Sequence, residues 1–307
     1  MQVRLDDVVI AVLGGDDREL ILIPELCKLG AVIRTAGIPV LTGMEGVSCF
    51  DTVKEAVAGA RFVILPMFGV DEQGLIKAKY ARKTLIVNRE VMSLFPPDAI
   101  IMVGVARPLL KELAAQQGLK LIEMLKRDDV TILNAIPSAE GAIQMAMEAV
   151  PITIHGSNCF VFGFGRTGMT LARMLKGIGA RTYVTARKPA DLARISEMGL
   201  IPLTYTELPA VIHKADIIFN TVPAIILNED LLKLANPGVY INDLASAPGG
   251  TDFAAAAELG IKAVLAPGLP GIVAPKTAGM ILARVVPSII GEQMALTSST
   301  NPEVNRF

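Results

Sequence analysis

The sequence has almost no net charge and no long uninterrupted apolar run. Its 307 residues contain 29 Lys and Arg against 30 Asp and Glu, a formal net charge of -1. Such a chain has no global field to draw it to nucleic acid or to an anionic membrane, so any anion site must be local. Gly, Pro or a charge breaks each apolar run before the roughly 18 residues that span a bilayer. We therefore expect neither nucleic acid nor a membrane as a partner.

Cysteine and histidine are scarce. The three cysteines, Cys27, Cys49 and Cys159, are widely spaced, form no CxxC motif and have no nearby histidine to complete a metal site. We expect all three to be small buried hydrophobic side chains, and we expect no metal centre. Only two histidines are available for acid–base chemistry.

Apolar residues are abundant and occur in short runs. The hydrophobic fraction is 52% and the mean hydropathy is +0.50. Short, almost entirely apolar runs are typical of parallel strands that helices cover on both faces, which favours the α/β class. The opening MQVRLDDVVIAVLGG has two acids before its apolar run and is unlike a secretory signal, so a cytoplasmic location is expected. The apolar content also leaves room for an interface between copies of the chain, and we expect a homo-oligomer.

Two series of strand-like runs divide the chain. The first comprises VVIAVL from Val8, AVIRTA from Ala31, RFVILPM from Arg61, KTLIVN from Lys83 and AIIMVG from Ala99. The second comprises SNCFVFGFG, RTYVTA, LIPLTY, ADIIFNTVP, GVYINDLAS and IKAVLAPG. Both alternate with helical or polar segments, as in a doubly wound parallel sheet.

The length suggests two domains. We expect a flavodoxin-like α/β domain over residues 1–133, completed by a C-terminal helix over 286–307, and a Rossmann dinucleotide-binding domain over 134–285. Crossing helices join them. One has Pro137 in its first turn, where a missing N–H costs nothing, and the other starts near Pro275 and is kinked at Pro287.

A glycine motif opens the second series. The apolar run CFVF ends on Gly163, and a helical pattern follows Gly168, which is the context that a dinucleotide-binding turn requires. Gly163 permits a tight turn, Gly165 lets a pyrophosphate approach the backbone, and Gly168 allows close packing of helix on strand. The expected cofactor contacts in this turn are Gly163, Phe164, Gly165, Arg166, Thr167 and Gly168.

The end of the next strand indicates which dinucleotide binds. An NAD site has an Asp or Glu there, which accepts hydrogen bonds from the ribose 2′-OH. This strand ends instead on Thr185, Arg187 and Lys188, and no carboxylate follows until Asp191. Arg holds a phosphate through two parallel N–H bonds and Lys adds a point charge. The sequence therefore predicts NADP(H).

The remaining strand ends should line the same crevice, because carboxyl ends of parallel strands share one edge. They follow the fourth, fifth and sixth strands, and we expect them to pass under the nicotinamide and its ribose. The expected contacts are Thr221, Val222 and Pro223, then Leu244, Ala245 and Ser246, then Pro267, Gly268, Leu269 and Pro270. Asp243 and Ser246 either brace the loop SAPGGTD or touch ligand.

Four residues are candidates for catalysis. Lys276 sits at an expected helix start, where the macrodipole disfavours a cation unless an anion is near. Ser138 and Glu140 begin the expected crossing helix, whose exposed N-terminus could bind a carboxylate. His155 precedes the first cofactor strand and has either a catalytic or a structural role.

Three other residues are weaker candidates. His213 is interpreted as a solvated surface residue. Arg107 and Arg89 of the first domain are possible partners of a substrate carboxylate.

Four segments resemble the A-subunit family of dipicolinate synthase from spore-forming bacteria. They are KRDDVTILNAIPSAEGAI, TIHGSNCFVFGFGRTGMTLAR, INDLASAPGGTDF and LAPGLPGIVAPKTAG, and the opening VVIAVLGGDDREL is similar more loosely. The resemblance implies a fold related to 2-hydroxyacid and alanine dehydrogenases. It also implies NADP-linked oxidation of dihydrodipicolinate to dipicolinate during sporulation, in the mother-cell cytoplasm, with the flavoprotein-like B subunit of dipicolinate synthase as partner.

Two alternatives stay open. A 2-hydroxyacid or amino-acid dehydrogenase would need an acid–base residue, commonly a His after the sixth strand, and only Lys276 lies there. A non-catalytic NADP-binding scaffold would have the same glycine turn, because binding is not turnover.

Overall fold

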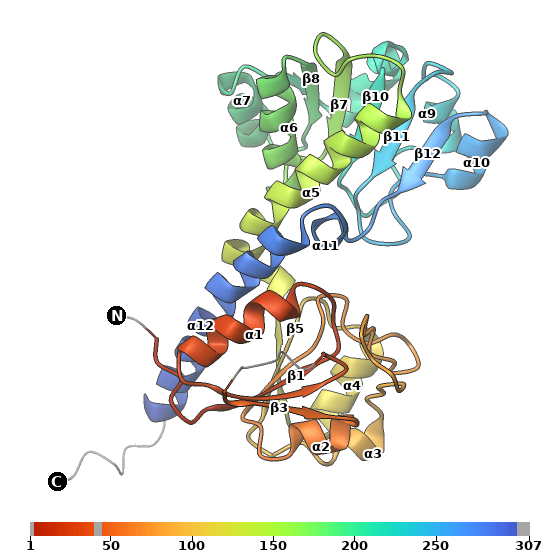
Figure 1. Cartoon of the computed structure of the whole chain (residues 1–307). Helices are drawn as coiled ribbons and strands as arrows, with labels where there is room; N and C mark the ends of the chain where they lie inside the picture. Colours follow the sequence, from red (N-terminus) through yellow and green to blue (C-terminus); the bar gives the residue numbers. More distant parts are fainter. Residues whose placement is uncertain (1–2, 40–44, 300–307) are drawn as a thin grey trace. The chain divides into compact units, whose positions relative to one another are not determined.

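The chain folds into two compact units, each built on its own six-stranded sheet (Figure 1). The structure is a computed structural model, and it describes residues 3–39 and 45–299. Unit 1 comprises Met1–Thr131 and Pro275–Phe307, and unit 2 comprises Ile132–Ala274. All strand pairs in both sheets are parallel. The predicted class, two doubly wound parallel-sheet domains of which the second is a Rossmann domain, is confirmed.

The sheet of unit 1 has the strand order β3-β2-β1-β4-β5-β6. This is the Rossmann order, whereas a flavodoxin-like sheet has the order 2-1-3-4-5. The flavodoxin-like expectation is therefore wrong, because β3 pairs with the outer side of β2 and leaves β4 beside β1. The elements are β1 Val9–Leu13, α1 Glu19–Lys28, β2 Val32–Ala36, β3 Val47–Phe50, α2 Val53–Val57, β4 Phe62–Ile64, α3 Arg89–Met92, β5 Ile100–Val103, α4 Pro108–Gln116, β6 Lys120–Glu123, η1 Met124–Lys126 and α12 Pro275–Ser299.

Four of the five strands predicted in this unit are present, and the run KTLIVN is not one of them. It forms a single antiparallel bridge, Leu75 with Ile86. Leu85 and Val87 are buried, while Ile86 between them is 39% exposed. The alternation of buried and exposed side chains therefore comes from a loop that covers the core, and not from a strand of the sheet. Two real strands, β3 and β6, were missed because both are edge strands with half-exposed side chains.

The cysteines differ in exposure. Cys159 is buried in β7, and Cys27 is half-buried in α1, but Cys49 on the edge strand β3 is exposed. The expectation that all three are buried is wrong for Cys49, because an edge strand has one face open to solvent.

Helix α12 belongs to unit 1 over its whole length, from Pro275 and not from residue 286. It packs on α1 closely: a Cβ on Gly279 would lie 2.9 Å from Ile21 Cβ and 3.0 Å from the Arg18 carbonyl oxygen. Residues Pro275–Leu296 also have the length and composition of a membrane span, with a mean hydropathy of 1.2, although charged and small residues interrupt the apolar run. The packing on α1 accounts for that apolar character, since core helices meet the same criterion.

Unit 2 has the strand order β12-β11-β10-β7-β8-β9, which is again the Rossmann order. All six predicted strands are present. The elements are α5 Asp128–Ala149, β7 Asn158–Phe162, α6 Arg166–Ile178, β8 Arg181–Thr185, α7 Pro189–Glu197, β9 Ile201–Leu203, η2 Tyr205–Glu207, α8 Leu208–Val211, η3 Ile212–Lys214, β10 Ile217–Asn220, α9 Glu229–Leu232, β11 Tyr240–Asp243, α10 Phe253–Glu258, β12 Lys262–Leu265 and α11 Leu269–Val273.

Helices cover both faces of this sheet. Cys159 and Val161 of β7 share one apolar cluster with α5, α6 and α7, while Phe160 and Phe162 share the other with α8, α9 and α10. Successive strand residues point to opposite faces, so every residue of β7 except its first is buried. The carboxyl ends of the strands are left uncovered by these two layers, and the candidate site lies there.

Helix α5 begins earlier than predicted. It starts at Asp128, and Pro137 lies inside it and not in its first turn. Two aspartates, Asp128 and Asp129, occupy the first turn, where acids are stabilised by the helix dipole. The predicted start was wrong because proline is favourable in the first turn of a helix. Here Pro137 lies inside the helix, where it removes one backbone hydrogen bond, and packing holds the helix together.

Candidate functional site

The glycine turn joins the carboxyl end of β7 to the start of α6. Gly163 has φ +93°, in the left-handed region, and a Cβ there would lie 2.7 Å from Thr221 Oγ1. A Cβ on Gly168 would overlap the Gly163 carbonyl oxygen. These two glycines are therefore required by the turn itself, as the sequence predicted.

Gly165 differs, because the protein leaves the space beside it empty. It is the N-cap of α6, and apart from its two chain neighbours no described residue has a heavy atom within 4 Å of where its Cβ would be. A 13-residue helix starts at this point, and the start of a helix directs N–H groups that have no intrahelical acceptor, with partial positive charge, toward a ligand. This open cradle fits a pyrophosphate.

The end of β8 exposes two cations beside that turn. Arg187 and Lys188 are both exposed, and neither forms a side-chain hydrogen bond or ion pair with the described residues. Thr185 behaves differently from its neighbours: it is 1% exposed, and its Oγ1 accepts a hydrogen bond of 3.0 Å from the Gly163 N–H. Thr185 thus braces the glycine turn, and Arg187 and Lys188 are available for a ligand anion.

The loop after β10 abuts the glycine turn. Thr221 donates from its hydroxyl to the Phe162 carbonyl at 2.7 Å, and its backbone N–H donates to the same oxygen at 2.9 Å. Val222 Cγ2 lies 2.8 Å from where a Gly163 Cβ would be. Two of the three residues predicted in this loop, Thr221 and Val222, are thereby brought to the turn, and Pro223 is exposed beside them.

The loops after β11 and β12 only partly match the prediction. Ser246 and Pro267 are exposed at the carboxyl edge. Leu269 and Pro270, in contrast, are buried, and Leu269 belongs to the apolar cluster beneath α5. A Cβ on Gly141 of α5 would lie 3.1 Å from Leu269 Cβ, so this part of the loop packs on α5 and offers no free surface to a cofactor.

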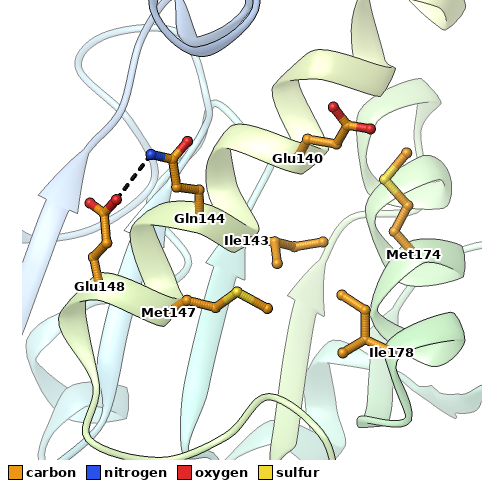
Figure 2. A pocket seen from close by; sticks show the side chains of 7 residues that line it. All are labelled: Glu140, Ile143, Gln144, Met147, Glu148, Met174 and Ile178. Atoms are coloured by element: carbon orange, nitrogen blue, oxygen red, sulfur yellow. Dashed lines mark hydrogen bonds between the residues drawn. The ribbon is translucent and has the colours of Figure 1, made fainter.

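Ser138 and Glu140 lie in the middle of α5, so the expected carboxylate site at a helix start does not form there. The Ser138 hydroxyl donates to the Asn134 carbonyl, one turn back in the same helix. Glu140 lines a groove of about 530 Å³ between α5 and α6, with Met147, Met174 and Ile178 (Figure 2). Met174 follows the start of α6 by eight residues, about 12 Å at 1.5 Å per residue. The groove is thus separate from the glycine turn.

His155 lies at the wrong edge of the sheet for catalysis beside the glycine turn. It precedes β7 and packs against Gly179, the C-cap of α6, whereas the glycine turn is at the N-terminal end of that helix. Thirteen helical residues separate the two ends, about 20 Å. His155 is exposed there, and His213 is exposed as expected.

Three further candidates belong to unit 1. Lys276 is exposed and is the second residue of α12, and Arg107 is exposed at the N-cap of α4. Arg89 is exposed at the first residue of α3. None of the three forms an ion pair within the described ranges.

Unit 1 has a turn at the equivalent place in its sheet, between β1 and α1, and the protein's own groups fill it. Asp16 N–H donates to Glu19 Oε2 at 2.7 Å, and Gly15 N–H donates to the Lys77 carbonyl at 2.9 Å. A Cβ on Gly15 would overlap the Glu19 carboxylate. The Glu19 carboxylate thus fills the turn of unit 1, whereas the turn of unit 2 is open beside Gly165, so unit 2 has the turn that can admit a dinucleotide.

Glu19 is the most perturbed carboxyl group of this turn. It is 2% exposed, and burial raises its pKa to about 7. Arg18, 5% exposed, binds Asp16 instead, through two bonds of 2.8 Å. Burial by itself would raise the pKa of the Asp16 carboxyl group, but its hydrogen bonds with Arg18 and the charge of that side chain hold the pKa below its usual value.

Stability should fall as pH rises through the range between the unfolded and folded pKa values of Glu19, from about 4.5 to about 7. In that range the folded state binds the proton more tightly than the unfolded state, so unfolding becomes easier as the proton is lost. Above it the buried charge costs about 3 kcal/mol. The measurement is the free energy of unfolding by denaturant between pH 5 and 8. Its decrease with pH in the wild type should be absent in Glu19→Gln, and an unchanged decrease would contradict the assignment to Glu19. Asp16 titrates below this window, since its pKa is lowered.

Asp243 has a larger role than its place in the sequence indicates. Its carboxylate is fully buried and accepts four hydrogen bonds, from Asn220, Ala245, Gly250 and Thr251. It braces the loop that follows β11, which was one of its two expected roles. The signal in the sequence was an acid at the end of an apolar strand with no basic residue near it.

Comparison with known proteins identifies both units. Residues 9–125 match the N-terminal domain of the dipicolinate synthase A subunit, and residues 138–248 match the NAD binding domain of the D-isomer specific 2-hydroxyacid dehydrogenases. The A subunit of dipicolinate synthase from Bacillus subtilis (strain 168) is 42% identical over 287 residues, which cover 93% of this chain and 97% of that protein.

Two solved structures are similar over nearly the whole chain. The crystal structure of the dipicolinate synthase A subunit from Bacillus halodurans has a TM-score of 0.90 and 36% identity, and covers 93% of this chain and 98% of its own. That of the Bacillus subtilis protein has a TM-score of 0.89 and 41% identity, covering 95% and 99%. Unit 2 is thus a nucleotide-binding dehydrogenase domain, and the chain belongs to the A-subunit family of dipicolinate synthase.

Proposed function

We propose that the protein is an NADP-dependent dehydrogenase that oxidises dihydrodipicolinate to dipicolinate. The observation that supports the cofactor choice is the end of β8, where Arg187 and Lys188 are exposed without partners among the described residues, and where no carboxylate follows in the sequence until Asp191. A carboxylate there would bind the 2′-OH of NAD and repel a 2′-phosphate. Two cations favour the phosphorylated ribose.

The residues of unit 2 would hold the cofactor at two points. The Gly165 cradle and the first N–H groups of α6 would bind the pyrophosphate, and Arg187 and Lys188 would bind the 2′-phosphate. When bound, NADP+ supplies the hydride acceptor. One hydride and one proton leave the dihydropyridine ring, which becomes aromatic, so the chemistry needs little acid–base assistance and depends mainly on orientation.

The substrate is a dicarboxylate, and cations are the groups that bind it best. Lys276 is our candidate for a carboxylate partner. It is exposed at the second residue of α12, where the helix dipole disfavours a lone cation, so that a bound anion would stabilise it. Arg107 is a second candidate, because its guanidinium has no ion-pair partner in the described ranges.

One assay tests the proposal. The purified chain, alone and with the B subunit of dipicolinate synthase, is mixed with NADP+ and freshly generated dihydrodipicolinate, and absorbance of the reduced nicotinamide is followed. Reduced cofactor from the chain alone supports the proposal. Reduction only with the second protein present favours the scaffold alternative, and turnover of a simple 2-hydroxyacid favours a hydroxyacid dehydrogenase. A parallel run with NAD+ measures the cofactor preference.

The biological setting is part of the same proposal. The flavoprotein-like B subunit would be the partner, a homo-oligomer the working form, and the mother-cell cytoplasm of a sporulating bacterium the location. Family membership supports this setting, since a relative 42% identical is named as one component of dipicolinate synthase.

A further inference from the structure

The buried carboxylate of Asp243 joins two loops at the carboxyl edge of the unit 2 sheet. Its Oδ1 accepts from Asn220 Nδ2 at 2.9 Å and from the Ala245 N–H at 3.0 Å. Its Oδ2 accepts from the Gly250 N–H at 2.8 Å and from Thr251 Oγ1 at 2.7 Å. The side chain is 0% exposed, and within the described residues no Lys, Arg or His forms an ion pair with it.

An acid this deeply buried is costly to place unless its hydrogen bonds are complete. Here polar groups alone satisfy it, and three of its four partners belong to the loop that follows β11. The fourth partner, Asn220, ends β10. Asp243 therefore acts as a clamp between the ends of two neighbouring strands.

The clamp continues to the glycine turn. The Asn220 side chain bonds both the N–H and the carbonyl of Val222, at 3.1 and 3.0 Å. Val222 Cγ2 in turn lies 2.8 Å from the Cβ position of Gly163. A Cβ on Gly250 would overlap the Val222 carbonyl oxygen, so the second loop presses directly on the first. One connected set of contacts runs from Thr251 to the turn that would hold the pyrophosphate.

The place of these contacts in the sheet indicates which half of the dinucleotide they would affect. In a Rossmann sheet the two nucleotide halves lie on opposite sides of the point where strand order reverses, here between β7 and β10. The 2′-phosphate cations are at β8, which assigns the adenosine half to that side. The ends of β10 and β11 are then left for the nicotinamide half.

We infer that Asp243 is a positioning residue for the nicotinamide half of the dinucleotide, acting through the loops at 220–224 and 244–251. The inference rests on the proposed function. It makes a specific prediction: weakening the clamp must reduce binding of the whole dinucleotide far more than binding of its adenosine half, because Arg187 and Lys188 at the end of β8 lie outside this set of contacts.

The test compares binding of NADP+ and of adenosine 2′,5′-bisphosphate by calorimetry. Asp243→Asn replaces one carboxylate oxygen by an NH2 group, which then faces the hydrogen-bond donors that the carboxylate accepted from. Thr251→Val keeps a similar side-chain shape and removes only one hydroxyl donor. It is the second clamp variant, used if Asp243→Asn does not fold. Asp216→Asn is the matched control: Asp216 Oδ2 also accepts a backbone N–H of this sheet, from Asn158 at 2.7 Å, but at the amino edge.

The clamp variants should bind NADP+ at least about tenfold more weakly and the bisphosphate within about threefold of wild type. Asp216→Asn should bind both normally. Unchanged NADP+ affinity in both clamp variants, or equal loss of both ligands, overturns the clamp and leaves the proposed function standing.

A wild-type chain that binds neither NADP+ nor NAD+ overturns both proposals. If it binds NAD+ alone, only the 2′-phosphate assignment fails, and the same comparison with NAD+ and ADP decides the clamp.

Discussion

Replacing Arg187 with Asp should weaken NADP+ binding by at least about 100-fold, because a charge-assisted contact to the 2′-phosphate is lost and replaced by repulsion. NAD+ binding should change by no more than about threefold, since a 2′-OH has no charge and Asp can accept a hydrogen bond from it. The measurement is the pair of dissociation constants, from quenching or calorimetry at one fixed salt concentration. Arg187 is exposed, so stability should be unaffected.

Arg181→Asp is the matched control for this change. Arg181 is also exposed and lies on the same strand, β8, but at its first residue, four positions before Thr185. A charge reversal there alters the net charge equally and should leave both affinities unchanged. Equal losses of NADP+ and NAD+ in Arg187→Asp would refute the phosphate assignment.

Two glycines of the turn, Gly165 and Gly168, should respond differently to alanine. Gly165→Ala should reduce dinucleotide binding more than about tenfold, since the new methyl group would enter the space left for the pyrophosphate. Its folding cost should stay below about 1 kcal/mol, because φ is -82° and the methyl meets no protein atom within 4 Å. Gly168→Ala should lose binding and also about 1–3 kcal/mol of stability, because its methyl overlaps the Gly163 carbonyl.

Gly177→Ala provides the reference within the same helix. Its Cβ also has no neighbour within 4 Å, yet it lies in the last turn of α6, away from the cradle. It should raise stability by up to about 1 kcal/mol, through helix propensity, and leave binding unchanged. Thermal melting and dinucleotide titration of the three variants separate the two roles; a Gly165→Ala protein that binds as wild type would rule out a pyrophosphate at this cradle.

Much of unit 2 was predictable because its signals are local. Each of its six strands is a short apolar run bounded by turn residues, and the spacing of Gly163, Gly165 and Gly168 defines a strand–turn–helix by itself. Unit 1 was harder to predict. Its edge strands β3 and β6 are too exposed to give an apolar run, and KTLIVN, which does give one, is a loop that covers the sheet.

The catalytic candidates were the least predictable part. Ser138 and Glu140 depended on a helix start at Pro137, but tertiary packing extends α5 back to Asp128 and places both in its middle. His155 was a candidate because it is close to Gly163 in sequence, yet a five-residue strand, β7, carries the turn to the opposite edge of the sheet. Thr185 looked like a ligand contact beside Arg187, but alternation along β8 directs it inward to the Gly163 N–H.

By itself, the sequence determined the α/β class, the dinucleotide turn and the cationic end of β8, because each depends on residues adjacent in the chain. Only the tertiary structure decided which turn is open. Both units share one strand order, but in unit 1 the Glu19 carboxylate fills the turn, and in unit 2 no side chain of the described residues fills the space beside Gly165. Only the structure, likewise, showed that Asp243 joins two loops, because its four partners come together only when β10 and β11 pair.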